Sequence, residues 1–161
     1  MVAKNDKAHV SLAKQIETKT CHRYYLALCN GNFKEDKGEI KTYIGRSKTD
    51  RKQMAAVSAN EGKLAITNYE VKKRYGKYTL VEFVLQTGRT HQIRVHSKHI
   101  NHSIVGDMLY GNKCEFKLNG QLLHAYKIEF NSPSSNERMS FSCELPDYFK
   151  KVLNKLENNL K

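Results

Sequence analysis

The sequence predicts a single α+β domain built on a mainly antiparallel sheet with flanking helices. Several strand-like runs are rich in β-branched and aromatic residues, and they are separated by turn residues rather than by long crossovers, which is typical of hairpins. A few stretches with helical spacing of apolar residues accompany them. With 161 residues, the chain is long enough for one domain with a hydrophobic core.

The first part of the chain is expected to hold one helix and two strands. Asn5 and Asp6 offer a cap for a helix that ends near residues 18–20. Its apolar face is modest and consists of Ala8, Leu12, Ala13 and Ile16. A strand follows over residues 24–29, and alternation predicts a short strand over 40–44. Residues 45–62 are polar and basic, which predicts a mobile loop.

Two hairpins and a last helix account for most of the remainder. Runs 65–75 and 78–85 flank Gly76 and form the first hairpin. The second joins runs 121–130 and 139–145 through turn residues. One face of its first strand is expected to carry Leu122, His124, Tyr126, Ile128 and Phe130. The terminal helix should begin near Pro146 with the apolar residues Phe149, Val152, Leu153, Leu156 and Leu160.

Residues 87–96, between the two hairpins, concentrate seven hydrogen-bonding or cationic side chains in ten positions. A helix is expected to start there with Thr90 as its N-cap. Helical spacing then places His91, Arg94 and Lys98 on one face. Because a helix N-terminus presents free N–H groups and partial positive charge, an anion is the expected ligand.

The charge balance favours a polyanionic partner. Lysine and arginine number 28 against 16 aspartates and glutamates, a formal net charge of +12 at pH 7. Acidic lipid is the other candidate, but no apolar run approaches the roughly 18 residues of a membrane span and no signal-like N-terminus is evident. We therefore expect a cytoplasmic protein that binds nucleic acid and no membrane.

A metal site is not expected. The four cysteines form no C-x-x-C pair, so reduced thiols are the better interpretation. The histidines that follow residue 90 are His91, His96, His99 and His102, with Asp107 nearby. Their spacing does not place three ligands on one helical face, and the basic surroundings disfavour a cation.

The tip of the first hairpin is a candidate RNA contact. Its cations are Lys72, Lys73, Arg74 and Lys77. They bracket Tyr75 and Tyr78, and aromatic rings between cations can stack bases while phosphates are neutralised. The alternative is that these are ordinary solubilising residues.

The spelling of residues 87–96, Thr-Gly-Arg-Thr-His-Gln-Ile-Arg-Val-His, closely resembles the third signature motif of the RluA-type RNA pseudouridine synthases. Further matches follow in order, and they are His102, Ile104, Gly106-Asp107, Tyr110-Gly111, Leu123-His124-Ala125 and Leu145-Pro146. Upstream, residues 23–27 resemble the K-x-Y-x-A motif with Arg23 in place of lysine. Asn101 and Ser103 depart from the usual glycine and proline. The resemblance covers nearly the whole chain.

The resemblance implies the pseudouridine synthase fold and isomerisation of uridine in structured RNA, rRNA or tRNA, with neither metal nor organic cofactor. Arg94 would pair with the nucleophilic aspartate, and Tyr25 would pack against the uracil and help to remove its C5 proton. The substrate-binding residues would be Arg89, Thr90, His91, Gln92 and Ile93, together with the hairpin-tip cations.

One family element has no match. The nucleophilic aspartate belongs to an R-L-D-x-x-T-S-G type motif that lies just upstream of the segment matching residues 2–9. We therefore expect residues 1–161 to be a single, N-terminally truncated catalytic domain that is inactive alone. The alternative is a non-enzymatic, basic RNA-binding module.

Overall fold

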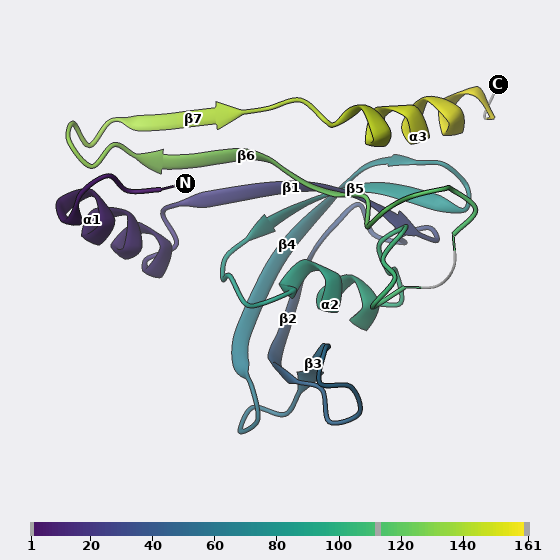
Figure 1. Cartoon of the computed structure of the whole chain (residues 1–161), viewed down its shortest axis with the longest axis horizontal. Helices are drawn as coiled ribbons and strands as arrows, with labels where there is room; N and C mark the ends of the chain where they lie inside the picture. The colour runs from purple at the N-terminus through teal and green to yellow at the C-terminus, as the bar shows by residue number, and fades with distance from the viewer. Residues whose placement is uncertain (1, 112–113, 160–161) are drawn as a thin grey trace.

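The computed structural model describes residues 2–111 and 114–159, which form a seven-stranded sheet and three helices (Figure 1). The elements are α1 (Asp6–Glu17), β1 (His22–Asn30), β2 (Lys37–Arg46), β3 (Met54–Val57), β4 (Lys63–Arg74), β5 (Tyr78–Leu85), α2 (Gln92–His99), β6 (Leu123–Asn131), β7 (Arg138–Ser142) and α3 (Asp147–Asn158). The strand order is β3-β2-β4-β5-β1-β6-β7, and every neighbouring pair is antiparallel. The expected fold class is confirmed.

The sheet has a core on each face because successive side chains of a strand point to opposite sides. On one face Ala27, Val81 and Phe83 pack with Ile93 of α2. On the other, Leu28 packs with Phe149 of α3. Figure 1 shows α1 and α3 at opposite ends of the long axis, with α2 beside the middle of the sheet.

Both terminal helices lie close to where the sequence predicts them. The Asn5 side chain caps α1 by accepting a hydrogen bond from the Ala8 amide at 2.9 Å. Its apolar face is only partly used, since Leu12 is buried while Ile16 stays 39 % exposed. In α3, Phe149, Val152 and Leu156 are buried as expected. Leu160 lies outside the described residues.

Residues 45–62 are more ordered than the predicted loop. They contain β3, which pairs with the end of β2 through Tyr43 to Arg46. The turn before β3 is tied by the Ser47 amide, which donates to the Gln53 carbonyl at 3.1 Å. The apolar residues of this segment show little periodicity, so the sequence did not reveal the four-residue edge strand β3.

Two local predictions need correction. Helix α2 has His91 rather than Thr90 as N-cap, because His91 adopts a left-handed conformation with φ of 55°. In β6, a bulge places Tyr24 opposite Lys127 but Tyr25 opposite Ala125, so Tyr126 is the extra residue. The bulge moves the following side chains to the other face, and the expected single apolar stripe is therefore interrupted.

The family departure at Asn101 is accommodated as expected, since this residue adopts φ of 62° after α2. All four cysteines are free, with Cys21 and Cys29 buried. In the part of the chain that the structure describes, no helix is long and apolar enough to cross a membrane.

Candidate active site

The turn before α2 is fixed by the buried side chain of Gln92, which is 2 % exposed. Its Oε1 accepts hydrogen bonds from the Thr87 hydroxyl at 2.8 Å and the Arg89 amide at 2.9 Å. Its Nε2 donates to the Ile66 carbonyl at 3.0 Å and to Thr67 Oγ1 at 2.8 Å. The amide therefore joins the turn to β4.

The structure places Gln92 and Ile93, two of the residues expected to bind the substrate, inside the protein. Ile93 is 4 % exposed and belongs to the core beneath α2. Because neither side chain reaches the surface, their contribution is to hold the turn. Arg89 and Thr90 beside them are exposed, and Arg89 Nε donates to the Leu64 carbonyl at 2.9 Å.

Arg94 forms a two-pronged ion pair with Asp107. Its Nε donates to Asp107 Oδ2 at 2.8 Å, and its Nη2 donates to Oδ1 at 2.7 Å. The Asp107 side chain is 0 % exposed and the Arg94 side chain 15 %. Oδ1 also accepts the backbone amides of Leu109 and Tyr110, each at 3.0 Å. This carboxylate is fully engaged by its own chain.

The ion pair sets the charge state of both groups. Burial alone would raise the pKa of Asp107, but the Arg94 guanidinium and the two backbone amides outweigh burial and hold it below its usual range. The hydrogen bonds from Arg94 to Asp107 raise the pKa of Arg94. Both groups are therefore charged at neutral pH.

Tyr110 contacts the three side chains predicted to share one helical face. His91 Nδ1 lies 2.8 Å from the Tyr110 hydroxyl, and Arg94 and Lys98 lie over the ring at 4.7 and 5.7 Å from its centroid. The same hydroxyl accepts the Met54 amide at 2.8 Å, which ties α2 to β3. Burial, together with the neighbouring Arg94 charge, lowers the pKa of His91, so its imidazole is neutral at pH 7.

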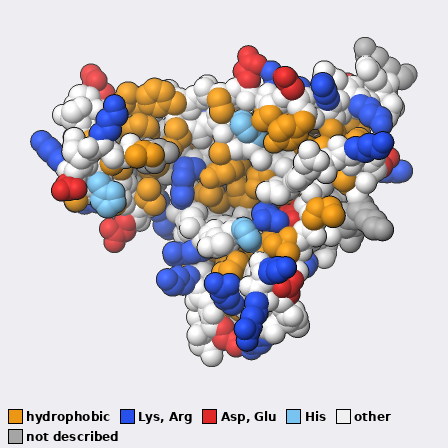
Figure 2. All heavy atoms as spheres, viewed as in Figure 1, with side chains coloured by type: hydrophobic (Ala, Val, Ile, Leu, Met, Phe, Trp, Pro, Cys, Tyr) orange, Lys and Arg blue, Asp and Glu red, His pale blue; other side chains and the backbone are white. Residues whose placement is uncertain are grey.

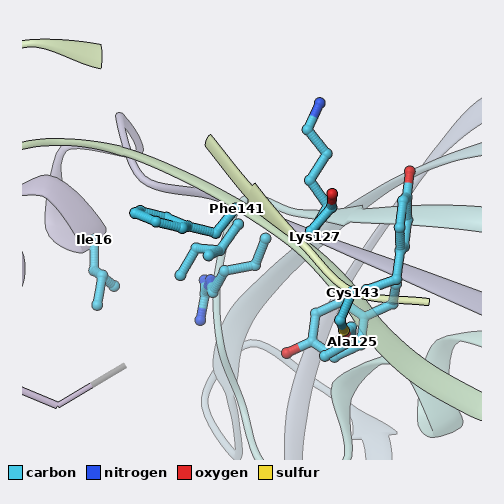
Figure 3. A pocket seen from close by; sticks show the side chains of 10 residues that line it. Ile16, Ala125, Lys127, Phe141 and Cys143 are labelled. Atoms are coloured by element: carbon cyan, nitrogen blue, oxygen red, sulfur yellow. Dashed lines mark hydrogen bonds between the residues drawn. The ribbon is translucent and has the colours of Figure 1, made fainter. Parts of the chain in front are cut away.

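A pocket of about 500 Å³ lies on the sheet beside Tyr25 (Figure 3), within the size range of small-ligand sites. Its lining comes from α1, β1, β6 and β7 and includes Ile16, Arg23, Tyr25, Ala125, Phe141 and Cys143. Tyr25 also packs against the core that contains Ile93, so the pocket and α2 share one face of the sheet. The pocket can take a flat, largely apolar ring next to a cation.

Arg23 is the residue of this pocket that the sequence reasoning did not assign. A Cβ added to Gly88 would lie 2.6 Å from Arg23 Nη1, so the guanidinium lies against the turn of residues 87–91 before α2, which we call the signature turn. Its Nε is buried without a hydrogen-bond partner among the described residues. The available signal was its place two residues before Tyr25, which strand periodicity puts on the same face.

The structure does not bring every expected residue together. Tyr25 lines the pocket, but Arg94 lies outside its lining and is engaged by Asp107 instead. The hairpin tip is also different from the prediction. Tyr75 and Tyr78 are 7 % and 8 % exposed, so neither ring is available to stack a base.

The hairpin-tip cations are largely neutralised by acidic neighbours. Lys72 pairs with Glu82 at 3.0 Å and with Glu70 at 3.4 Å. Arg74 pairs with Asp36 at 2.8 Å, and Lys73 pairs with a glutamate of α3. Lys77 is exposed and has no carboxylate partner in the described part of the chain. The tip therefore presents less free positive charge than the sequence suggested.

The histidines of this region have structural partners. His96 is 0 % exposed between Thr42 Oγ1 at 3.0 Å and Thr67 Oγ1 at 2.9 Å, and burial lowers its pKa to about 4. His102 Nδ1 lies 2.8 Å from the Asn30 carbonyl. Within residues 2–111 and 114–159, no group of three or more histidines, cysteines or acidic residues is arranged to hold a metal ion.

Comparison with known proteins places this site in context. Residues 1–99 match the family model described as RNA pseudouridylate synthase. The chain is 43 % identical over 159 residues to the uncharacterized RNA pseudouridine synthase YlyB of Bacillus subtilis, covering 99 % of this chain and 52 % of that protein. It is 42 % identical to ribosomal large subunit pseudouridine synthase D of Neisseria meningitidis, covering 91 % and 42 %.

A solved structure agrees with these relatives. Human RNA pseudouridylate synthase domain containing 1 superposes with a TM-score of 0.74 at 25 % identity, covering 97 % of this chain and 74 % of that one. The chain spans about half the length of the curated relatives that it matches.

Proposed function

This chain belongs to the RNA pseudouridylate synthase family, and on that premise we propose that it forms the uridine-binding part of an enzyme that isomerises uridine to pseudouridine in structured RNA, rRNA or tRNA. The observation that carries the proposal is the pocket lined by Tyr25 and Arg23, in which the Arg23 guanidinium lies against the signature turn at Gly88. A cytoplasmic location is part of the same proposal.

In the proposed reaction, the target uridine leaves its stack and enters the pocket, at a cost of a few kcal/mol that is lowest in an RNA loop. The Tyr25 ring packs against the uracil, and Ala125 and Phe141 supply further apolar contacts from the pocket lining. An aspartate carboxylate then attacks the nucleoside covalently and the glycosidic bond from N1 breaks. The uracil is rejoined through C5, the bond to the carboxylate breaks, N1 takes up a proton, and the C5 proton is lost to solvent with the help of Tyr25. The proposal requires neither metal nor organic cofactor.

We propose that the nucleophile comes from outside these 161 residues, since no aspartate in the described part of the chain lines the pocket. Asp107 is sealed by Arg94 and by backbone amides. Asp6 and Asp147 lie in the first turns of α1 and α3, Asp36 pairs with Arg74, and Asp50 accepts the Lys52 amide at 2.8 Å. We propose that the isolated chain is inactive for this reason.

Arg94 remains our choice for the cation that holds the nucleophile, with a changed geometry. Nε and Nη2, the two nitrogens expected to bind the carboxylate of the nucleophile, already donate hydrogen bonds to Asp107. Its Nη1 has no hydrogen-bond partner among the described residues. In the proposal, Asp107 fixes the plane of the guanidinium, and Nη1 meets the nucleophile. Asp107 is thus a positioning residue.

A non-enzymatic RNA-binding module is the second candidate. The net charge of +12 and the sealed Asp107 favour it, since both fit a chain that binds RNA without reacting with it. The two candidate functions predict different results when an upstream segment with the nucleophilic aspartate is added. An enzyme should then become active, whereas a binding module should not.

Tritium release from RNA labelled at uridine C5 distinguishes them. We expect none from the isolated chain and release from the chain joined to an upstream segment that carries the R-L-D-x-x-T-S-G type motif, such as that of a relative. An Asp→Asn change in the added motif is the control, and it should remove the activity. Tritium release by the isolated chain, once contaminating host enzyme is excluded, would contradict the proposal that the nucleophile comes from outside these 161 residues. An inert joined protein that still binds RNA would favour the binding module.

A further inference from the structure

The cations of this protein differ in whether an acidic side chain neutralises them. Those of the β4–β5 tip are mostly paired, as are Lys37, Lys127 and Arg138 elsewhere on the sheet. Exposed cations without a carboxylate partner among the described residues also occur on α1 and α3, such as Lys14 and Lys151, but six of them lie together around β3 and the signature turn. They are Arg46, Arg51, Lys52, Lys63, Arg89 and Lys98. We call this set the basic end.

The basic end is visible as a group of lysine and arginine side chains at the lower end of the molecule (Figure 2), where Figure 1 places β3 and its flanking loops. The acidic side chains of Glu61 and Asp50 in the same region already have partners within it. Glu61 pairs with Lys48, and Asp50 accepts the Lys52 amide and a hydrogen bond from the Gln53 amide group at 3.0 Å.

Two of these guanidinium groups are anchored without loss of charge. Arg46 Nη1 donates to the Arg51 carbonyl at 3.1 Å, and Arg89 Nε donates to the Leu64 carbonyl at 2.9 Å. A carbonyl fixes the side chain but does not neutralise it, so the remaining N–H groups stay available to an anion. Lys98 is held over the Tyr110 ring. The charge is therefore presented from defined positions.

The basic end is also connected to α2. The Tyr110 hydroxyl accepts the Met54 amide at the start of β3 and contacts His91 at the start of α2. A cleft of about 570 Å³ separates β3 from the signature turn, with Lys63 and Arg89 among its lining residues. An anionic chain bound to β3 would continue to the turn that carries Arg89.

We propose that the basic end, rather than the β4–β5 tip, holds the sugar-phosphate backbone of the RNA beside the reacting uridine. This inference rests on the proposed function and names the surface that it uses. RNA fits better than an acidic protein, because protein interfaces need a buried apolar centre and the large apolar side chains of this end are few. Phosphates need only cations and N–H groups, which this end supplies.

The test compares two charge reversals of equal size. Arg51→Glu/Lys52→Glu changes the basic end, and Lys151→Glu/Lys155→Glu changes exposed cations of α3. Binding of a labelled RNA stem-loop is measured over a salt series by fluorescence anisotropy. Thermal unfolding shows that both variants are folded.

We expect the basic-end variant to bind on the order of ten-fold more weakly at low salt. The slope of log K against log salt should flatten by roughly 1.4–1.8 for two lost phosphate contacts, at about 0.7 each on a single strand and about 0.9 each on a duplex. The α3 variant should change little, because a distant charge is screened. Equal weakening in both variants would overturn the proposal, since binding would then follow net charge alone. Displacement of the RNA by polyglutamate at equal charge concentration would also overturn it in favour of an acidic protein partner.

Failure of this inference can be told from failure of the proposed function. The chain joined to its upstream segment is assayed for tritium release with and without Arg51→Glu/Lys52→Glu. A raised KM with kcat retained is the expected result. An unchanged KM would remove the basic end from RNA recognition while leaving the isomerase activity in place.

Discussion

Replacing Arg94 by methionine should destabilise the isolated chain strongly, because it leaves Asp107 buried without its cation. The carboxylate is 0 % exposed, and Arg94 reaches both of its oxygens within 2.8 Å. Removing one partner of such a pair costs about 3–5 kcal/mol. Total stabilities are about 5–15 kcal/mol, so the loss is a large fraction of the free energy of unfolding.

Urea unfolding at pH 7 measures this loss. With a denaturant slope of about 2 kcal/mol per molar, the midpoint should fall by roughly 1.5–2.5 M. Methionine preserves an apolar stem over the Tyr110 ring, so the lost charge dominates the effect. The matched control is Lys37→Met, because Lys37 pairs with Glu70 at 3.3 Å on the surface and the expected loss is under about 1 kcal/mol.

A double variant separates the charge from the packing. In Arg94→Met/Asp107→Asn no charge is buried, and the carboxamide oxygen can still accept the Leu109 and Tyr110 amides. It should therefore recover about 2 kcal/mol relative to Arg94→Met alone. The reasoning is refuted if Arg94→Met costs no more than Lys37→Met, or if the double variant is less stable than the single one.

Three further predictions concern pH, metal and the pocket. The pKa of His96 falls to about 4 on folding, so between pH 6.5 and 4 the unfolded chain binds a proton that the folded chain does not. The free energy of unfolding should therefore drop by at most about 3 kcal/mol as the pH falls through this range. His96→Asn should flatten this pH dependence. The purified chain should contain no stoichiometric zinc, and a chelator should leave its melting temperature unchanged, whereas one zinc per chain would contradict the proposed site. In the joined protein Arg23→Ala should slow tritium release more than Arg23→Lys, and equal rates would remove the guanidinium from the site.

The fold class was predictable because it depends on patterns that a strand or helix displays locally. The runs that became β4 and β5 alternate clearly around Gly76, and the Asn5 cap precedes a helical period. Segments whose structure depends on distant partners were not predictable. Strand β3 exists because β2 offers it an edge, and the bulge at Tyr126 depends on the register with β1.

The same distinction applies to the site. Helical spacing predicted that His91, Arg94 and Lys98 share a face, which Tyr110 now connects. The partners of the charges could not be read from spacing. Lys72 and Glu82 are ten residues apart yet meet across a hairpin, and the fork of Arg94 is taken by Asp107 from a later loop. Burial of Tyr75 and Tyr78 also depends on α3, which comes at the other end of the chain.

The most direct test of the central claim is tritium release by the joined protein in a series of single variants. We predict that Arg94→Ala abolishes release and that Arg94→Lys recovers little of it, because lysine keeps the charge but loses the planar fork that Asp107 fixes. Tyr25→Phe should slow release with RNA binding nearly intact, and Arg89→Ala should mainly weaken RNA binding. Near-normal release by Arg94→Ala, together with its loss in Arg89→Ala, would contradict the assigned roles.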